Sequence, residues 1–141
     1  MFDWIFGSKK EEGKKEEELG KDEQWIYDYV RQYLNSPLWR NPLLDFLEEH
    51  CHVFEDKEEN KFEYTKIFQE FTGLTALLIE TMIEEVGISE KTLEKCILKG
   101  MRSEKDAKIF RQILICDNFE SFKKNMLTKN KELEIQAMKN L

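Results

Sequence analysis

The longest helical pattern in the chain is FEYTKIFQEFTGLTALLIETMIEEV, residues 62–86. Its apolar residues recur at intervals of three and four, the spacing that places side chains on one face of an α-helix. These residues are Tyr64, Ile67, Phe68, Phe71, Leu74, Leu78, Met82 and Val86. The spacing continues across Gly73, so the stretch predicts either one long helix or two helices joined by a kink near that glycine.

Helix-ending and helix-starting residues follow this stretch. Gly87 is placed to end the helix, because glycine readily adopts the left-handed backbone that closes a helix. Ser89 is then predicted to cap the next helix. The run Ser103-Glu104-Lys105-Asp106 resembles a capping box with Asp in place of the usual Glu. Asp117 and Glu120 mark the start of a last helix.

Two shorter helices are predicted on the N-terminal side. The first has an apolar stripe formed by Trp25, Ile26, Tyr29, Val30, Tyr33 and Leu34. The run Asn35-Ser36-Pro37 should end it. Asn41 followed by Pro42 predicts the cap and first turn of a second helix that extends to about Val53. Residues 55–60 are mostly acidic and are predicted to form a loop.

These elements predict an all-α fold, a compact bundle of about six helices over residues 25–141. Residues 8–24 hold five lysines, seven acids and two glycines. Such a segment buries too little apolar surface to offset the entropy of ordering, so we expect a flexible charged linker. Residues 1–7 form a short hydrophobic, amphipathic segment in front of it.

Composition limits the classes of partner and compartment. The 141 residues carry a net charge of −7, which disfavours a nucleic-acid partner because no basic surface is available. No apolar run approaches the roughly 20 residues that span a bilayer, so stable membrane insertion is not expected. The odd number of cysteines, Cys51, Cys96 and Cys116, fits a reducing compartment better than a disulfide framework. We therefore expect a cytoplasmic protein.

Three possible metal or catalytic sites can be considered, and each lacks the spacing or the residues that its chemistry requires. His50 and His52 are two residues apart on a predicted helix, so their imidazoles point about 200° apart and cannot share one zinc ion. Residues 56–60 match the early positions of a calcium loop, but Lys61 and Ile67 stand where Gly and Glu are required. The chain has no other histidine to activate a nucleophile and no glycine-rich phosphate loop. We expect no enzyme activity, no cofactor and no metal site.

Aromatic residues are abundant, with ten Phe, four Tyr and three Trp making 12% of the chain. Many fall in one dense series, which comprises Phe54, Phe62, Tyr64, Phe68 and Phe71, joined later by Phe119 and Phe122. One interpretation places these side chains in the core. The other places part of them along a groove that receives an amphipathic helix. Sequence alone leaves both open.

The run FEDKEENKFEYTKIFQEF, residues 54–71, resembles the signature of the BART domain family, F-E-D-x-E-E-N-K-x-x-Y-T-x-I-F-x-E. Residues 117–126, with Phe119, Phe122 and Lys123, are similar to the family's D-F-x-x-F-K-x-x-M segment. Flanking residues resemble the ciliary branch typified by cilia- and flagella-associated protein 36: Trp39, Pro42, Leu44, Asp45, Phe46, Cys51, Val53 and Gly87-Ile88. The resemblance covers about residues 25–138.

The resemblance implies a non-enzymatic effector or adaptor module. Members of the family form an all-α bundle that binds the GTP-loaded form of an ADP-ribosylation-factor-like small GTPase and grips its N-terminal amphipathic helix in a hydrophobic groove. By position, the expected groove residues are Tyr64, Phe68, Phe71, Phe119, Phe122 and Met126. The expected acidic rim is Glu55, Asp56, Glu58 and Glu59. The ciliary branch further implies ciliary traffic and a location in a cilium or flagellum.

Two further possibilities stay open at this point. The bundle is alternatively a structural ciliary or cytoskeletal component that docks on another protein independently of nucleotide. Separately, Met1, Phe2, Trp4 and Ile5 have the spacing of the amphipathic helix presented by the family's partners. We hypothesise that this segment folds back and occupies the chain's own groove. A weak membrane contact and a disordered end are the other interpretations of the segment.

The negative charge is concentrated in one region. Residues 45–70 hold nine acids against three lysines, a net of −6. This region contains the family signature, where negative charge would steer a basic amphipathic helix toward a groove. The distribution predicts an association that weakens as salt is added.

Overall fold

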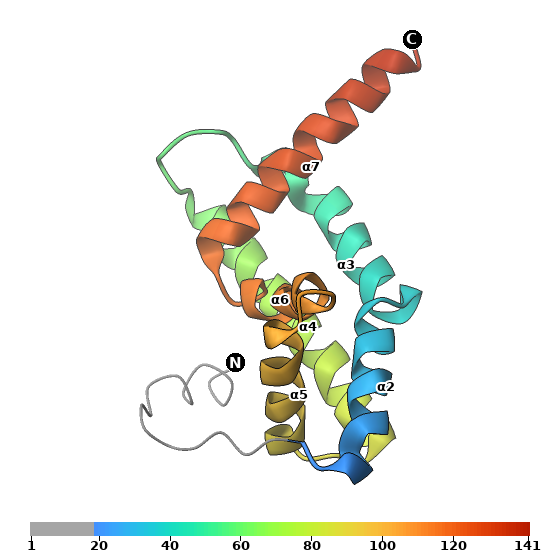
Figure 1. Ribbon diagram of the computed structural model, residues 1–141. Coiled ribbons are helices and arrows are strands. Elements are labelled where there is room, and N and C mark those ends of the chain that lie inside the picture. Colours follow the sequence, from blue (N-terminus) through green and yellow to red (C-terminus); the bar gives the residue numbers. More distant parts are fainter. Residues whose placement is uncertain (1–18) are drawn as a thin grey trace.

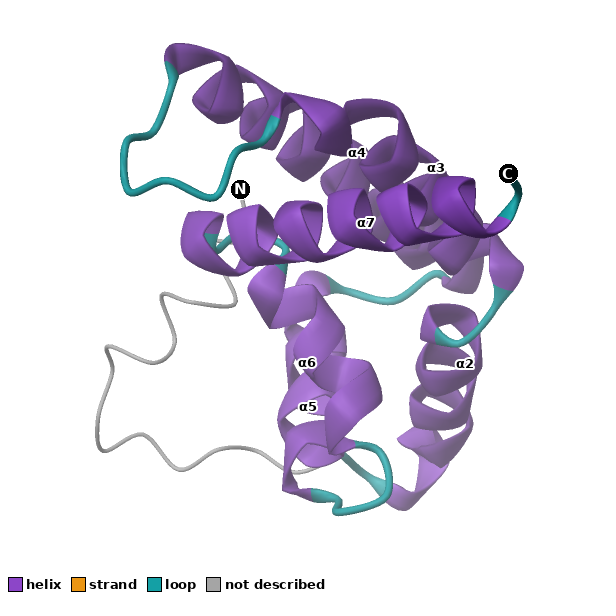
Figure 2. Cartoon of the chain, turned by 90° about the horizontal axis from the view of Figure 1, so that it is seen from above, coloured by secondary structure: helices purple, strands orange, loops and turns teal. Residues whose placement is uncertain are grey.

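The computed structural model describes residues 19–141 and is built from helices (Figures 1 and 2). They are η2 (Lys21–Glu23), α2 (Gln24–Leu34), α3 (Pro37–His50), η3 (Cys51–Val53), α4 (Phe62–Val86), α5 (Glu90–Arg102), α6 (Ala107–Ile115) and α7 (Phe119–Lys139), η2 and η3 being short 3₁₀-helices. No strand forms between residues 19 and 141, so the predicted all-α class is confirmed. The hydrophobic segment and most of the predicted linker lie outside the described residues.

Helix α4 is a single continuous helix, which settles the question of a kink at Gly73. It ends as the sequence predicts, because Gly87 takes the left-handed conformation with φ 76°. The Gly87 and Ile88 N–H groups both donate to the Ile83 carbonyl, at 2.9 and 3.3 Å. Ser89 caps α5 as predicted, since its hydroxyl accepts a hydrogen bond from the Thr92 N–H at 3.1 Å.

Helix α3 begins earlier than predicted. Its first residue is Pro37, preceded by Ser36 in extended conformation, and Pro42 lies inside the helix. The prediction of a helix start at Asn41 was therefore wrong. Ser36-Pro37 places an extended polar residue and a first-turn proline five residues upstream, and the helix continues past Pro42 at the cost of one backbone hydrogen bond.

The starts of α6 and α7 also differ from prediction. The Ser103 hydroxyl accepts the Asp106 N–H at 3.3 Å, which is one half of the predicted capping box. The Asp106 carboxylate does not complete the box, because it accepts from the Tyr27 hydroxyl on α2 instead. At α7 the capping residue is Asn118 rather than Asp117, and its side chain accepts the Ser121 N–H at 2.9 Å.

The helices pack as two groups, which meet where α2 contacts α3 and where α6 contacts α7. Helices α2, α5 and α6 contact one another, and α3, α4 and α7 contact one another, as the views from the side and from above show (Figures 1 and 2). The Tyr33 hydroxyl on α2 donates to the Leu78 carbonyl on α4 at 2.9 Å and links the two groups. The largest fully buried side chains are Trp39, Tyr64, Phe54, Phe110, Phe122, Leu34, Ile79, Met82, Leu93, Ile97 and Ile113.

Helix α2 buries four residues of the expected stripe, Ile26, Val30, Tyr33 and Leu34, but its buried face differs at three positions. Tyr27 is buried and stacks on the Phe110 ring with centroids 5.4 Å apart. Trp25 is 58% exposed and Tyr29 is 38% exposed, although both belong to the predicted stripe. The stripe is shifted because α2 packs on α5 and α6 as well as on α3, so the buried face extends to Tyr27.

Candidate functional site

The family signature and the segment at the start of α7 meet in space as an aromatic cluster. The Phe54 and Tyr64 rings stack with centroids 4.4 Å apart. Phe122 from α7 packs edge-on against Phe54 at 5.7 Å and also contacts Phe71 at 4.8 Å. Phe68 contacts Phe119 edge-on at 5.5 Å and Phe122 at 5.3 Å. The cluster therefore joins the first turns of α4 to the first turns of α7.

The six predicted groove residues divide into two sets by burial. Tyr64, Phe71, Phe122 and Met126 are buried among core residues, so in this arrangement they contact other core side chains. Phe68 and Phe119 are only partly buried and pack against that core from outside. The structure thus brings the two predicted stretches together, and it leaves Phe68 and Phe119 as the members with surface exposed.

The loop between η3 and α4 is tied to this cluster. The Glu55 N–H donates to the Tyr64 hydroxyl at 2.9 Å, and the Asn130 side chain of α7 donates to the Phe54 carbonyl at 3.5 Å. Further along, the Lys123 ammonium donates to the Lys57 carbonyl at 2.6 Å and to the Asn60 side-chain oxygen at 2.8 Å. The loop is therefore held at several points by α4 and α7.

The four predicted rim acids are all exposed but differ in their surroundings. The Glu55 carboxylate lies 3.3 Å from the Lys57 ammonium and 3.4 Å from the Lys61 ammonium. These two cations, Lys57 above all, hold the pKa of Glu55 below its ordinary value. Glu55 is thus engaged within the loop. Asp56, Glu58 and Glu59 are the acids whose charge faces solvent on the loop.

Lys123 is the residue that sequence reasoning missed. It is 8% exposed on α7, and its ammonium lies 5.7 Å from the centre of the Tyr64 ring. A lysine this deeply buried requires partners, because an ammonium removed from water without them is costly. The one sequence feature that pointed to Lys123 was its position in the family's second segment, residues 117–126. Its partners are 63 and 66 residues away in sequence, so no local pattern reveals them.

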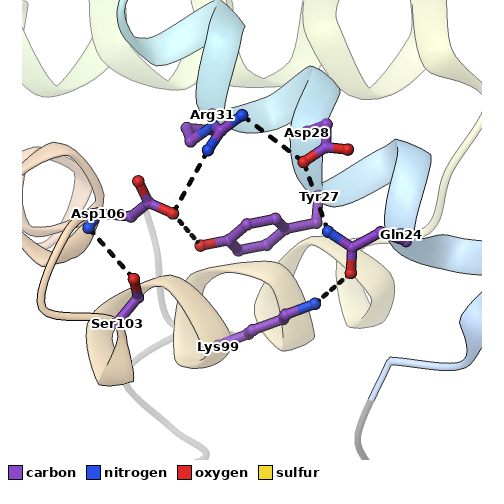
Figure 3. Close-up of polar contacts among 7 residues, drawn as sticks. All are labelled: Gln24, Tyr27, Asp28, Arg31, Lys99, Ser103 and Asp106. Atoms are coloured by element: carbon purple, nitrogen blue, oxygen red, sulfur yellow. Dashed lines mark hydrogen bonds and ion pairs between the residues drawn. The ribbon is translucent and has the colours of Figure 1, made fainter.

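A second polar cluster lies where α2 meets α5 and α6 (Figure 3). The Tyr27 hydroxyl donates to Asp106 at 2.6 Å, and the Arg31 guanidinium lies 3.7 Å from the same carboxylate oxygen. Lys99 donates to the Gln24 side chain, and its ammonium lies 4.6 Å from the Tyr27 ring centre. Burial and the hydrogen bond to Asp106 raise the pKa of Tyr27 above its ordinary value. These contacts tie α2 to α5 and to the connection between α5 and α6.

The metal and nucleophile candidates have ordinary structural surroundings. The His50 ring packs against Phe46 with centroids 4.4 Å apart, whereas His52 is exposed. Over residues 19–141 no three His, Cys, Asp or Glu side chains gather as a metal site. The three cysteines are free and buried. Burial raises the pKa of Cys96 to about 11 and that of Cys116 to about 12, which keeps both thiols protonated at neutral pH.

None of the helices between residues 19 and 141 is both long and apolar enough to cross a bilayer.

Several known proteins are similar to this chain. Cilia- and flagella-associated protein 36 of Caenorhabditis elegans is 26% identical over 136 residues, which is 93% of this chain and 19% of that protein. ADP-ribosylation factor-like protein 2-binding protein of Xenopus laevis is 34% identical over 90 residues, 63% of this chain and 58% of that protein. The same protein of Gallus gallus is 32% identical over 114 residues, 80% of this chain and 73% of that protein.

The chain spans about a fifth of the nematode relative and less than three-fifths of the frog relative. The family model described as "The ARF-like 2 binding protein BART" matches residues 22–135. This range takes in α2 through most of α7, with both segments that form the aromatic cluster. The chain therefore belongs to the BART family of ARF-like 2 binding proteins.

Proposed function

We propose that this protein is an adaptor that binds an ADP-ribosylation-factor-like small GTPase in its GTP-loaded state, as part of ciliary traffic. The observation that carries the proposal is the partly exposed aromatic edge formed by Phe68 and Phe119, whose ring centroids are 5.5 Å apart. The family match and the names of the frog and chicken relatives support a GTPase partner.

The aromatic edge lies next to the acidic loop. Phe68 is one helical turn after Tyr64, and Phe119 is one turn before Lys123; Tyr64 and Lys123 are the residues that contact the loop. One turn is about 5.4 Å along a helix. An amphipathic helix lying on the edge would bury apolar side chains against the two phenylalanines, and its basic residues would meet the acids of the loop.

The groove of the proposal has an outer and an inner part. Phe68 and Phe119 supply the outer surface. Tyr64, Phe71, Phe122 and Met126 are buried in the core, and the partner helix would reach these residues only if α4 and α7 moved apart. The acidic rim consists chiefly of Asp56, Glu58 and Glu59, with Glu55 ordering the loop.

Affinity measurements with single alanine variants test the site. Phe68→Ala and Phe119→Ala should each weaken binding of the GTP-loaded GTPase by about tenfold or more, the effect of removing a large aromatic anchor. The control is Leu77→Ala, which removes a 60% exposed side chain elsewhere on α4 and should leave affinity within about twofold. Equal losses in all three variants, or none, would overturn the assignment.

A second candidate function is a structural ciliary or cytoskeletal component that docks regardless of nucleotide. The observation that favours it is the match to cilia- and flagella-associated protein 36 over 93% of this chain. Capture experiments with the GTPase carrying a non-hydrolysable GTP analogue or GDP separate the two functions. Preferential recovery with the GTP analogue supports the effector function, and equal recovery supports the structural one.

Self-occupation of the groove by Met1, Phe2, Trp4 and Ile5 stays a prediction, because these residues lie outside the described part of the chain. Deletion of residues 1–10 provides the test. If the segment competes with the GTPase, affinity should rise on deletion. Unchanged affinity would count against competition.

A further inference from the structure

We infer that Lys123 is a positioning residue that fixes the shape of the acidic loop, residues 55–60, so that its exposed acids form a preorganised binding surface. The role for partner binding rests on the proposed function. The role in holding the loop follows from contacts within the chain and is tested separately.

The anchor consists of one buried cation and two oxygen acceptors. Lys123 donates to the Lys57 carbonyl at 2.6 Å and to the Asn60 side chain at 2.8 Å, with the Tyr64 ring face 5.7 Å away. Hydrogen bonds from a charged donor are shorter and stronger than neutral ones, and a ring face further stabilises a cation. The two acceptors lie in the middle and at the end of the loop, so a single side chain constrains both.

The beginning of the loop is held independently of Lys123. The Glu55 N–H donates to Tyr64, and Asn130 donates to the Phe54 carbonyl. The Lys57 N–H donates to the Glu55 carbonyl at 2.8 Å and tightens the first turn. With the beginning, middle and end all held, Asp56, Glu58 and Glu59 project from a backbone of defined shape.

A loop with a fixed backbone binds at a lower entropic cost than a mobile one. Helix α7 also connects the two parts of the proposed site, because it carries Lys123 and, one turn earlier, Phe119. Removal of the ammonium should therefore free the loop while the helices keep their structure, since η3, α4 and α7 remain packed through the aromatic cluster.

The test compares two variants that remove the same charge from neighbouring positions. Lys123→Met keeps an apolar stem of similar length but removes the anchor. Lys124→Met is the matched control, because Lys124 is exposed on the same helix. Asn60→Ala removes one acceptor from the opposite side, so it serves as a second variant if Lys123→Met unfolds.

Three measurements are made on each variant: circular dichroism, cleavage after Glu58 and Glu59 by a glutamyl endopeptidase, and affinity for the GTP-loaded GTPase. We expect Lys123→Met to keep its helical signal, to be cleaved in the loop at least about tenfold faster, and to bind the GTPase about tenfold more weakly. Asn60→Ala should change in the same direction by a smaller factor. Lys124→Met should match the unmodified chain in all three.

Each other outcome overturns a named part of the inference. Unchanged loop cleavage in folded Lys123→Met overturns the anchor. Faster cleavage with unchanged affinity overturns the role in binding. If the unmodified chain binds no GTPase in either nucleotide state, the proposed function fails, while the cleavage rates still decide whether Lys123 holds the loop.

Discussion

The ring of Phe110 lies directly against the backbone of Gly100, in the space that a Cβ atom at that position would occupy. This contact lets α5 and α6 cross closely, and it places the Phe110 ring where Tyr27 stacks on it at 5.4 Å. The absence of a side chain at residue 100 thus sets how the α2, α5 and α6 group packs.

Gly100→Ala should destabilise the fold. Alanine favours a helix over glycine by up to about 1 kcal/mol, but overlap with a buried ring costs about 1–3 kcal/mol or more. We expect a net loss of about 1–2 kcal/mol in the free energy of unfolding, measured in urea. Gly73→Ala is the control, because no atom lies within 4 Å of its Cβ position. It should stabilise the chain, and the same sign for both variants would contradict the packing argument.

Tyr27→Phe should lower stability by about 1.5–3 kcal/mol, because a hydrogen bond to a charged group is lost inside the protein. The Asp106 carboxylate is only 5% exposed, so water does not readily replace the hydroxyl. Tyr29→Phe, on the exposed side of the same helix, should change stability by less than about 0.5 kcal/mol. Chemical denaturation of both variants gives the comparison, and a neutral Tyr27→Phe would show that Arg31 alone satisfies Asp106.

Alkaline pH should destabilise the fold before it ionises the buried thiols. Cysteine titrates near pH 9.0 when unfolded, whereas the pKa is about 11 for Cys96 and about 12 for Cys116 in the folded chain. Raised values mean that the unfolded state releases protons first, so this contribution is complete below pH 9 and is lost between pH 9 and 12. Urea midpoints measured from pH 8 to 11 should therefore fall, less steeply in Cys96→Ala/Cys116→Ala. A flat profile would contradict the burial of these thiols.

Salt should weaken the proposed association through the exposed acids of the loop. Glu58→Gln/Glu59→Gln should reduce the association rate constant for the GTPase by about threefold or more at low ionic strength, with little difference at high salt. Glu80→Gln/Glu84→Gln makes the same change in net charge on exposed positions of α4 and should have a smaller effect. Stopped-flow measurements at two salt concentrations decide the matter. Equal effects would reduce the acidic loop to a solvated connector.

The helices that could be predicted are those with signals next to each other in sequence. The α4 pattern, Gly87 and Ser89 lie within one stretch and specify the helix, its end and the following cap. The start of α3 was predicted wrongly because two Pro-containing pairs, Ser36-Pro37 and Asn41-Pro42, can each begin a helix. Local sequence rules do not decide between them. The Asp106 carboxylate likewise does not form the predicted capping hydrogen bond, because it accepts one from a tyrosine 79 residues away.

The two stretches that form the candidate site could be identified from the sequence, but the burial of their individual aromatic residues could not. Both stretches that form it were identified, yet helical spacing is the same for a buried and a half-buried aromatic residue. Phe68 and Phe119 differ from Phe71 and Phe122 only through which neighbours cover them. The contacts of Lys123 were not predicted, because its two acceptors belong to a loop 63 and 66 residues away in sequence, beyond the reach of any local pattern.

The long sequence separations of the polar ties bear on how the protein is made. Asn60 is hydrogen-bonded to a lysine 63 residues later in the chain, and Tyr27 to an aspartate 79 residues later. Closing such separations costs loop entropy before any contact is gained. During synthesis the acidic loop emerges long before Lys123, so the loop takes its anchored shape only after the start of α7 has left the ribosome.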